Sequence, residues 1–343
     1  MEHNFDSSTS LLQRSVPYLQ LFIAILAVSF SAIIVVLLID RDVPSEVTAM
    51  YRTFFAGVGA LLLSIPKKKI SWISKKTTLK KMHWIVLAGV LLAIHFATWF
   101  ISLEYVSVAI STTLVDTVPI FLAIFGFIFF KEKVGGIGII GIIIAFIGGT
   151  LLAFASNLPD IKNYLVTDIK GELISLIQTS NSGLQPNAIL GIIFSLIGAI
   201  TVTFYFLIGK KILQDSPLWP YFALVNLTSF VSLLIYCLIR GYKLFSFTAF
   251  AYLLLFLAAL GPSLVGHATY NYSLRKLPAF VVGVAILGEP VGATILGVLI
   301  LGQKPDLIII LYAGIILLGI ILTSISQNLN FRIFKRKEDR ITI

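Results

Sequence analysis

Ten apolar segments, each about 20 residues long, follow one another along this chain of 343 residues. A helix needs about 20 mostly apolar residues to cross a bilayer, where every backbone polar group must be satisfied internally. Charged residues make up only 12% of the chain, whereas soluble domains carry about 25%. We therefore predict an all-α membrane protein with ten transmembrane helices. The expected spans are 17–39, 45–65, 83–103, 107–130, 135–155, 187–209, 217–239, 248–274, 278–301 and 306–325.

Basic residues are distributed unevenly between the two ends of these spans. One side collects the basic stretches 67–81 and 332–340 together with Arg14, Lys131, Lys133, Lys210, Lys211, Arg275 and Lys276. The other side has only Arg41, Lys162, Lys170, Arg240, Lys243 and Lys304. Because cytoplasmic loops carry the excess of Lys and Arg, we expect both termini in the cytoplasm and the chain in the plasma membrane.

Charge and cysteine content argue against several other classes of protein. The formal net charge of +10 would suggest nucleic acid in a soluble domain, but here it reflects membrane sidedness. Cys237 is the only cysteine, so no intrachain disulfide and no cysteine-based metal site can form. The first apolar segment is full length and lacks a small-residue cleavage pattern, so we predict a retained span. We expect no cofactor, no metal and no nucleic acid, but a lipid bilayer and a monomer or weak homodimer.

An internal repeat relates the two halves of the chain at a shift of 171 residues. The shift aligns Pro119 with Pro290 and Gly126 with Gly297. Each half would hold five spans, an odd number, so the second copy should enter the membrane the opposite way up. Inverted repeats are typical of secondary transporters, whose site lies near the midplane between the halves. A duplicated scaffold without a transport role is the alternative.

The expected organisation follows from this repeat. We predict a cytoplasmic tail 1–16, a first repeat 17–155, an extracytoplasmic loop 156–186, a second repeat 187–325 and a basic cytoplasmic tail 326–343. Within the loop, apolar residues at i, i+4 spacing fit either a short helix on the membrane surface or an ordinary loop.

Glu289 and Pro290 stand side by side within the apolar stretch AILGEPVGA. A charged side chain at the bilayer centre costs about 2.5–3.5 kcal/mol on insertion scales and usually faces a bundle interior or a cavity. Proline removes the donor that the Ile286 carbonyl would use. Beside that break, Glu289 can bind a substrate amine or a proton exchanged for substrate. The alternative is a neutral carboxylic acid that joins two helices by hydrogen bonds.

Pro119 repeats this arrangement in the first half, where it would free the Val115 carbonyl. Asp116 lies three residues earlier, on roughly the same helix face. Arg52 is the third charged residue inside a span, nearer to its outer end. Asp116 is therefore a candidate binding residue, or it simply pairs with Arg52.

Two further groups of polar and aromatic residues share helix faces. His95 and Trp99 are spaced i, i+4, and His267, Tyr270 and Asn271 are spaced i, i+3 and i+4. These residues are candidates to line a cavity for substrate or ions. The histidines can equally be hydrogen-bonded packing residues, and the aromatic side chains can pack between helices.

The most specific motif is GPSLVGHATYNYSLRKLPAFVVGVAILGEPVGATILGVLILGQKP, at 261–305. It resembles the second half of EamA-type carriers of the drug/metabolite transporter superfamily. TAMYR in the second span and SLEYVSVAISTTLVDTVPIFLAIFGFIFFKEKVG at 102–135 resemble the first half. Gln303 departs from the pattern, because the second repeat often has Glu there. The resemblance implies two inverted five-helix repeats, alternating access, a small-molecule substrate such as an amino acid, and coupling to protons or exchange.

The sequence therefore predicts a secondary active transporter that exports a small amine-bearing or zwitterionic metabolite. An integral membrane enzyme that uses the same buried His and carboxylate residues is one alternative, although no nucleophile motif accompanies them. A channel or a non-transporting scaffold is another, and a continuous polar pore would favour the channel.

Overall fold

The computed structural model describes residues 7–65, 69–102, 105, 111, 114–156, 188–301, 305 and 307–341. These residues form helices and turns, with no strand among them. In this part of the chain, eight helices are long and apolar enough to cross a membrane, and two shorter ones are apolar. The all-α membrane class is thus confirmed. Apart from Ser156, the expected extracytoplasmic loop 156–186 lies outside the described residues.

The first half contains α1 (Ser7–Ile39), α2 (Ser45–Ser64), a 3₁₀ turn η1 (Lys69–Trp72), α3 (Lys76–Ser102), α5 (Val118–Phe130) and α6 (Gly136–Ser156). The second half contains α9 (Ala188–Ile212), α10 (Leu218–Ile239), α11 (Ala249–Ala258), η2 (Ala259–His267), α12 (Ala268–Ser273), α13 (Ala279–Ile286), α14 (Glu289–Leu301) and α15 (Leu307–Ile341). α1 and α15 extend beyond their apolar parts into the expected polar tails 1–16 and 326–343.

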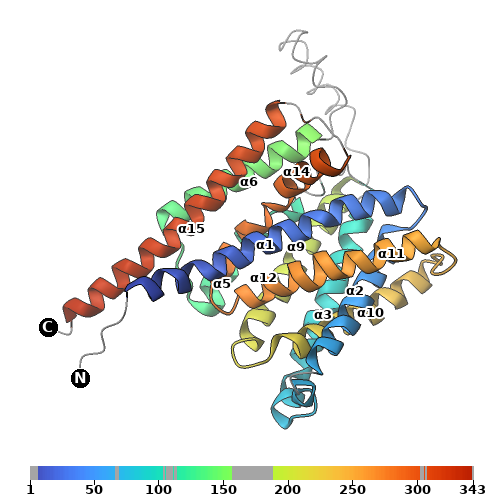
Figure 1. Ribbon diagram of the computed structural model, residues 1–343, viewed down its shortest axis with the longest axis horizontal. Coiled ribbons are helices and arrows are strands. Elements are labelled where there is room, and N and C mark those ends of the chain that lie inside the picture. Colours follow the sequence, from blue (N-terminus) through green and yellow to red (C-terminus); the bar gives the residue numbers. More distant parts are fainter. Residues whose placement is uncertain are drawn as a thin grey trace, which may run out of the picture.

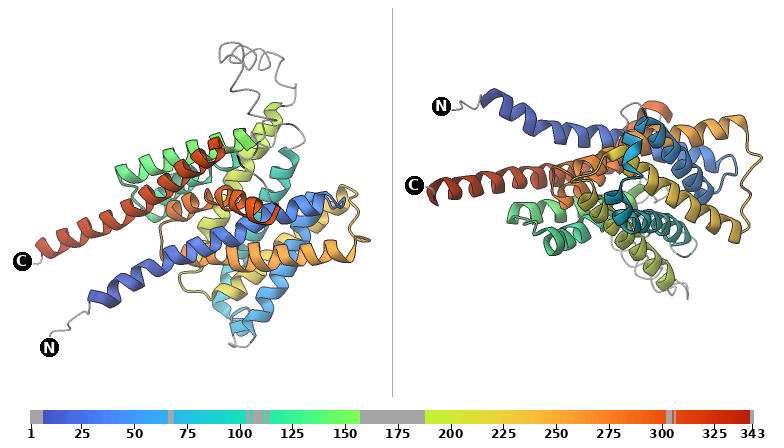
Figure 2. Two further views of the ribbon diagram at one scale, coloured as in Figure 1. Left: turned by 45° about the horizontal axis from the view of Figure 1, so that its top comes forward. Right: turned by 90° about the horizontal axis from the view of Figure 1, so that it is seen from below.

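Helix boundaries follow the 171-residue shift. α5 and α14 each have 13 residues, start 171 positions apart and carry proline as their second residue. α3 and α12 end at positions related by the same shift, and α6 and α15 begin at such positions. The beginning of α1 and the end of α15 lie at the same end of the molecule (Figure 1 and Figure 2).

Two predicted spans depart from a regular α-helix. The span expected at 248–274 contains η2, a nine-residue π-helix with Pro262 inside it. Proline cannot donate to the helical ladder, and π-type turns are frequent at functional sites. The span expected at 278–301 is divided into α13 and α14 by a turn at Leu287 and Gly288. Both irregular segments lie at mid-span. There the backbone N–H and C=O groups do not follow the regular α-helical hydrogen-bond pattern.

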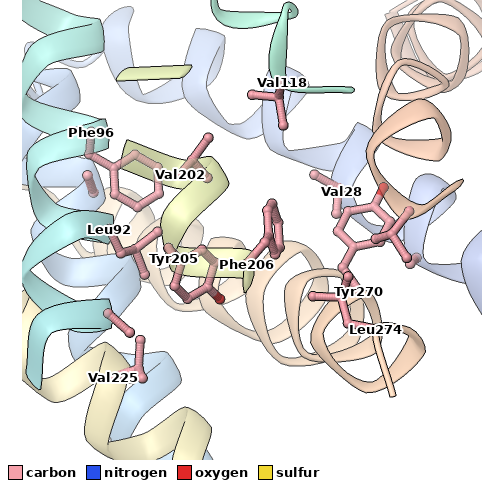
Figure 3. Close-up of a cluster of buried hydrophobic side chains, with 14 of the residues drawn as sticks. Val28, Leu92, Phe96, Val118, Val202, Tyr205, Phe206, Val225, Tyr270 and Leu274 are labelled. Carbon is pink, nitrogen blue, oxygen red and sulfur yellow. The ribbon is translucent and has the colours of Figure 1, made fainter. Parts of the chain in front are cut away.

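Close packing holds the helices together. α6 and α15 run side by side along one edge of the molecule, and α1 crosses beside α11 and α12 (Figure 1). Glycines permit the close approaches, since a Cβ at Gly89 of α3 would lie 2.7 Å from the Val225 carbonyl oxygen of α10. At the centre, Tyr205 and Phe206 of α9 share one buried cluster with Leu92 and Phe96 of α3 (Figure 3). This cluster borders the candidate site.

Candidate functional site

Arg52 of α2 reaches into the interior and contacts two neighbouring elements. Its Nε donates to Ser263 Oγ of η2 at 2.7 Å, and one terminal nitrogen donates to Ser31 Oγ of α1 at 3.1 Å. The guanidinium carbon lies 5.7 Å from the centre of the Phe96 ring, within cation–π range. The two serine side chains are 4% and 8% exposed. The arginine is therefore fixed in position by three helical segments.

A small cavity surrounds this guanidinium. Its lining residues come from α2, α3, α9, α10 and η2, and they are Arg52, Thr53, Leu92, Phe96, Tyr205, Asn226, Ser263 and His267. The cavity measures about 10 Å³, which is close to the space that one water molecule occupies. The site is thus closed in this conformation, and the helices around it must separate to admit a metabolite.

Glu289 and Asp116 lie at the two helix breaks. Glu289 is the first residue of α14, and Asp116 sits in the turn before α5. Pro290 and Pro119 are the second residues of those helices, where their missing N–H is not needed. Each break is therefore a turn ahead of the proline, not a kink inside one helix. Ser29 Oγ of α1 lies 3.0 Å from the Glu289 carbonyl oxygen and tethers α14 to α1.

The charged residues are close enough to interact, yet they are not in contact. Glu289 interacts electrostatically with Arg52 and with Asp116. Among the described residues, the ion pairs within 4 Å are Lys81–Asp215 and Lys210–Glu132. The alternative in which Asp116 simply pairs with Arg52 is therefore not observed, because Ser31 and Ser263 hold the guanidinium.

The two histidines occupy different surroundings. His95 Nδ1 lies 3.0 Å from the Gly198 carbonyl oxygen, so Nδ1 carries the hydrogen. Its ring stacks near that of Trp99, with centroids 6.3 Å apart. His267 lines the cavity, and both histidines interact electrostatically with Arg52. His95 thus makes the hydrogen-bonded packing contact that is the alternative to lining the cavity, whereas His267 lines the cavity.

Asn271 and Tyr270 follow His267 toward the end of α12. Asn271 Nδ2 donates to Tyr205 Oη at 2.6 Å and to the His267 carbonyl oxygen at 2.9 Å. Tyr270 is 1% exposed, lies in the buried cluster of Figure 3 and interacts electrostatically with Glu289. Within the described part of the chain, its hydroxyl has no hydrogen-bond partner. The predicted residues of the second half therefore surround one central region.

A second polar cluster joins the halves at one end of the bundle. Lys210 Nζ lies 2.8 Å from Glu132 Oε1 and donates to the carbonyl oxygens of Leu274 and Leu277 at 3.0 and 2.7 Å. Glu132 Oε2 accepts from the backbone N–H of Ala279 at 2.8 Å. The Lys210 and Glu132 side chains are 10% and 11% exposed. This pair closes the ends of α9, α12 and α13 against the turn after α5.

Sequence patterns did not identify Ser31, Ser263, Glu132 or Lys210 as site residues. Serines are common in membrane helices, where they can bond either their own helix or a neighbouring one, so single positions carry little signal. Glu132 and Lys210 stand at span ends, where charged residues usually face water. Pro262 beside Ser263 was the one available hint. The described residues contain no group of three or more His, Cys, Asp or Glu placed to hold a metal ion.

Comparison with known proteins assigns the family. An uncharacterized transporter of Clostridium kluyveri is 24% identical over 268 residues, covering 77% of this chain and 79% of its own. A protein of known crystal structure superposes with a TM-score of 0.73 at 15% identity, over 92% of this chain and 98% of its own, and so has the same fold. The model of the EamA-like transporter family matches twice, at residues 16–154 and 189–325. The chain therefore belongs to the EamA-like transporter family and is a membrane transporter, not an enzyme.

Proposed function

We propose that this transporter is a secondary active exporter of a small metabolite, such as an amino acid or related amine-bearing compound. The observation that carries the proposal is the central arrangement of Glu289 and Arg52. They are a carboxyl group and a guanidinium within electrostatic range; serine contacts hold the guanidinium, and a helix break places the carboxyl group. Membrane-embedded ionisable residues are costly, and they commonly mark substrate or ion pathways.

Transport proceeds by alternating access in this proposal. Ten spans form two inverted five-helix repeats, and the site lies between them near the midplane. The coincident helix boundaries at a shift of 171 residues support two equivalent halves. The common location of the α1 start and the α15 end supports an even number of crossings, with both termini in the cytoplasm at the plasma membrane (Figure 2). Proton coupling or exchange drives the cycle.

The lining residues have separate roles in this scheme. Glu289 is the central acid that binds the amine or exchanges a proton, and Asp116 is its counterpart in the first repeat. His267, Tyr270 and Asn271 form the wall contributed by the second repeat. On α3, Leu92 and Phe96 line the cavity, and His95 and Trp99 stay candidates to contact substrate once the helices separate. Pro119 and Pro290 mark the breaks that place the two acids.

Counterflow in proteoliposomes tests the proposal. Vesicles are loaded with members of a panel of amino acids and amines, and uptake of the same labelled compound is followed. We expect Glu289→Gln to lower the initial exchange rate about tenfold or more, because a charge-assisted contact contributes about 1.5–3 kcal/mol. Glu46→Gln is the matched control, since Glu46 Oε1 accepts from Tyr242 Oη at 2.6 Å and a glutamine oxygen can accept the same bond.

Two results would contradict the proposal. Equal exchange by wild type and Glu289→Gln would leave Glu289 as a packing residue. Absence of exchange for the whole panel, with folded protein in the vesicles, would remove amino acids and amines as the substrate class.

A further inference from the structure

Arg52 is the cation of the central region, and it has no anion in contact with it among the described residues. Of its five N–H groups, two are used by Ser263 and Ser31. No described carboxylate lies within 4 Å of the guanidinium. A charge removed from water without an opposite charge beside it is unfavourable, so the protein would gain from an anion at this position.

The two serines complete a donor set around Arg52. Each hydroxyl oxygen accepts a hydrogen bond from the guanidinium and keeps its own hydrogen to donate elsewhere. No further bond of either hydroxyl occurs within the part of the chain that is described. Arg52 therefore keeps three N–H groups, and each hydroxyl keeps one hydrogen, to offer to a bound anion. The planar guanidinium fork matches the two oxygens of a carboxylate.

The neighbouring charge limits the chemistry of the anion. Glu289 lies within electrostatic range of the same guanidinium. A phosphate dianion would place two negative charges beside this carboxyl group, whereas a carboxylate with an attached ammonium group offers one partner to each residue. The cavity walls also include Leu92 and Phe96, which suit an uncharged side chain. The arrangement therefore favours a zwitterion over a phosphorylated compound or a simple cation.

We propose that Arg52, with Ser31 and Ser263, forms the subsite that binds the carboxylate of the transported compound, and that Glu289 faces its amine. The substrate class is thus α-amino acids with a free carboxylate. This inference rests on the proposed function. It adds that decarboxylated amines and carboxyl esters are discriminated against. Because the cavity of about 10 Å³ is closed, the carboxylate enters when the surrounding helices separate.

Competition in counterflow tests the subsite with the wild-type chain alone. The amino acid with the fastest exchange is challenged with its methyl ester and with its decarboxylated amine. We expect both analogues to compete at least about tenfold more weakly than the amino acid, the effect of losing one charge-assisted contact. Because this comparison needs no variant, it does not depend on whether an altered Arg52 folds.

Variants then locate the effect. Arg52→Gln is expected to weaken competition by the amino acid about ten- to a hundredfold while leaving the decarboxylated amine unchanged, so the preference disappears. Arg52→Lys keeps the charge without the fork and should retain part of the preference. Arg41→Gln is the control, because the Arg41 side chain donates to the Leu37 carbonyl oxygen of its own helix end and lies over Phe250, away from the cavity lining.

The outcomes separate this inference from the proposed function. Exchange of an amino acid with equal competition by its ester and amine would overturn the carboxylate subsite but leave the carrier intact. Exchange of amines without any amino acid would do the same. No exchange of any compound would overturn the proposed function, and the subsite with it. A preference that persists in folded Arg52→Gln would place the carboxylate elsewhere.

Discussion

Replacing Lys210 by methionine is expected to destabilise the protein by about 3 kcal/mol. Methionine keeps the apolar stem but removes the charge that faces Glu132 at 2.8 Å and the donors to Leu274 and Leu277. Breaking a buried ion pair by removing one partner costs about 3–5 kcal/mol, because the other charge stays buried. About a tenth of each side chain is exposed, so the lower part of that range applies.

Reversible unfolding of the purified protein in mixed micelles measures this loss. The double variant Glu132→Gln with Lys210→Met should recover part of it, because it removes the uncompensated charge. Its glutamine oxygen can still accept from the Ala279 N–H, which now bonds Glu132 Oε2 at 2.8 Å. A double variant that is less stable than Lys210→Met would contradict a charge-driven contact.

Lys81→Met supplies the matched control. Lys81 pairs with Asp215 at 2.6 Å and lowers the pKa of that carboxyl, so the pair is charged at pH 7. Its side chains are 32% and 67% exposed, and exposed pairs contribute only about 0–1 kcal/mol. Equal destabilisation by Lys81→Met and Lys210→Met would show that burial does not set the strength of the Lys210 contact.

The same pair has a consequence for transport. Under alternating access, the helices that close one end of the site must separate in each cycle, and Lys210 and Glu132 join four of those helix ends. In a Cys237→Ser background, Ala279→Cys should react slowly with a maleimide, since Ala279 is 0% exposed. Adding Lys210→Met should speed the reaction by shifting the population toward the opened form. An unchanged reaction rate would show that the Lys210–Glu132 pair does not control this opening.

Sequence patterns predicted the helices well because a bilayer requires long apolar runs. The proline alignment also found the breaks, since α5 and α14 both begin one residue before it. Glu289 and Asp116 remain predicted site residues, chosen because a carboxylate in an apolar segment is costly. Each of these features depends on the residue type at a single position and its neighbours along the chain, and a single sequence contains that information.

Contacts between distant segments could not be predicted in the same way. Arg52 bonds Ser263, which is 211 positions away, and the ordinary serine gives no sign of that partner. The π-helix η2 changes which residues of the eighth span face the site, so regular helical spacing does not describe that wall. Lys210 and Glu132 fit the pattern of cytoplasmic charge, and only the fold shows that they meet and are buried.

The contact between α6 and α15 should be as sensitive to side-chain volume as the Lys210 contact is to charge. A Cβ at Gly319 of α15 would lie 2.6 Å from the Ala145 Cβ and 2.6 Å from the Gly141 carbonyl oxygen of α6. Gly141 is held just as closely, since its Cβ would lie 2.7 Å from the Thr323 backbone nitrogen. Backbone atoms cannot rotate away, so any added group must push the two helices apart.

Gly319→Val is therefore expected to cost about 3 kcal/mol, the upper part of the usual overpacking range. Membrane helices associate through close packing of small residues, without a hydrophobic force between them to offset such a loss. Gly314→Val on the same helix is the control, because a Cβ there meets nothing within 4 Å, and it should change stability by about 0.5 kcal/mol or less. If both variants unfold at the same denaturant concentration, the helices have room to adjust. A loss confined to Gly319 would show that the last helix is held to the bundle by backbone proximity.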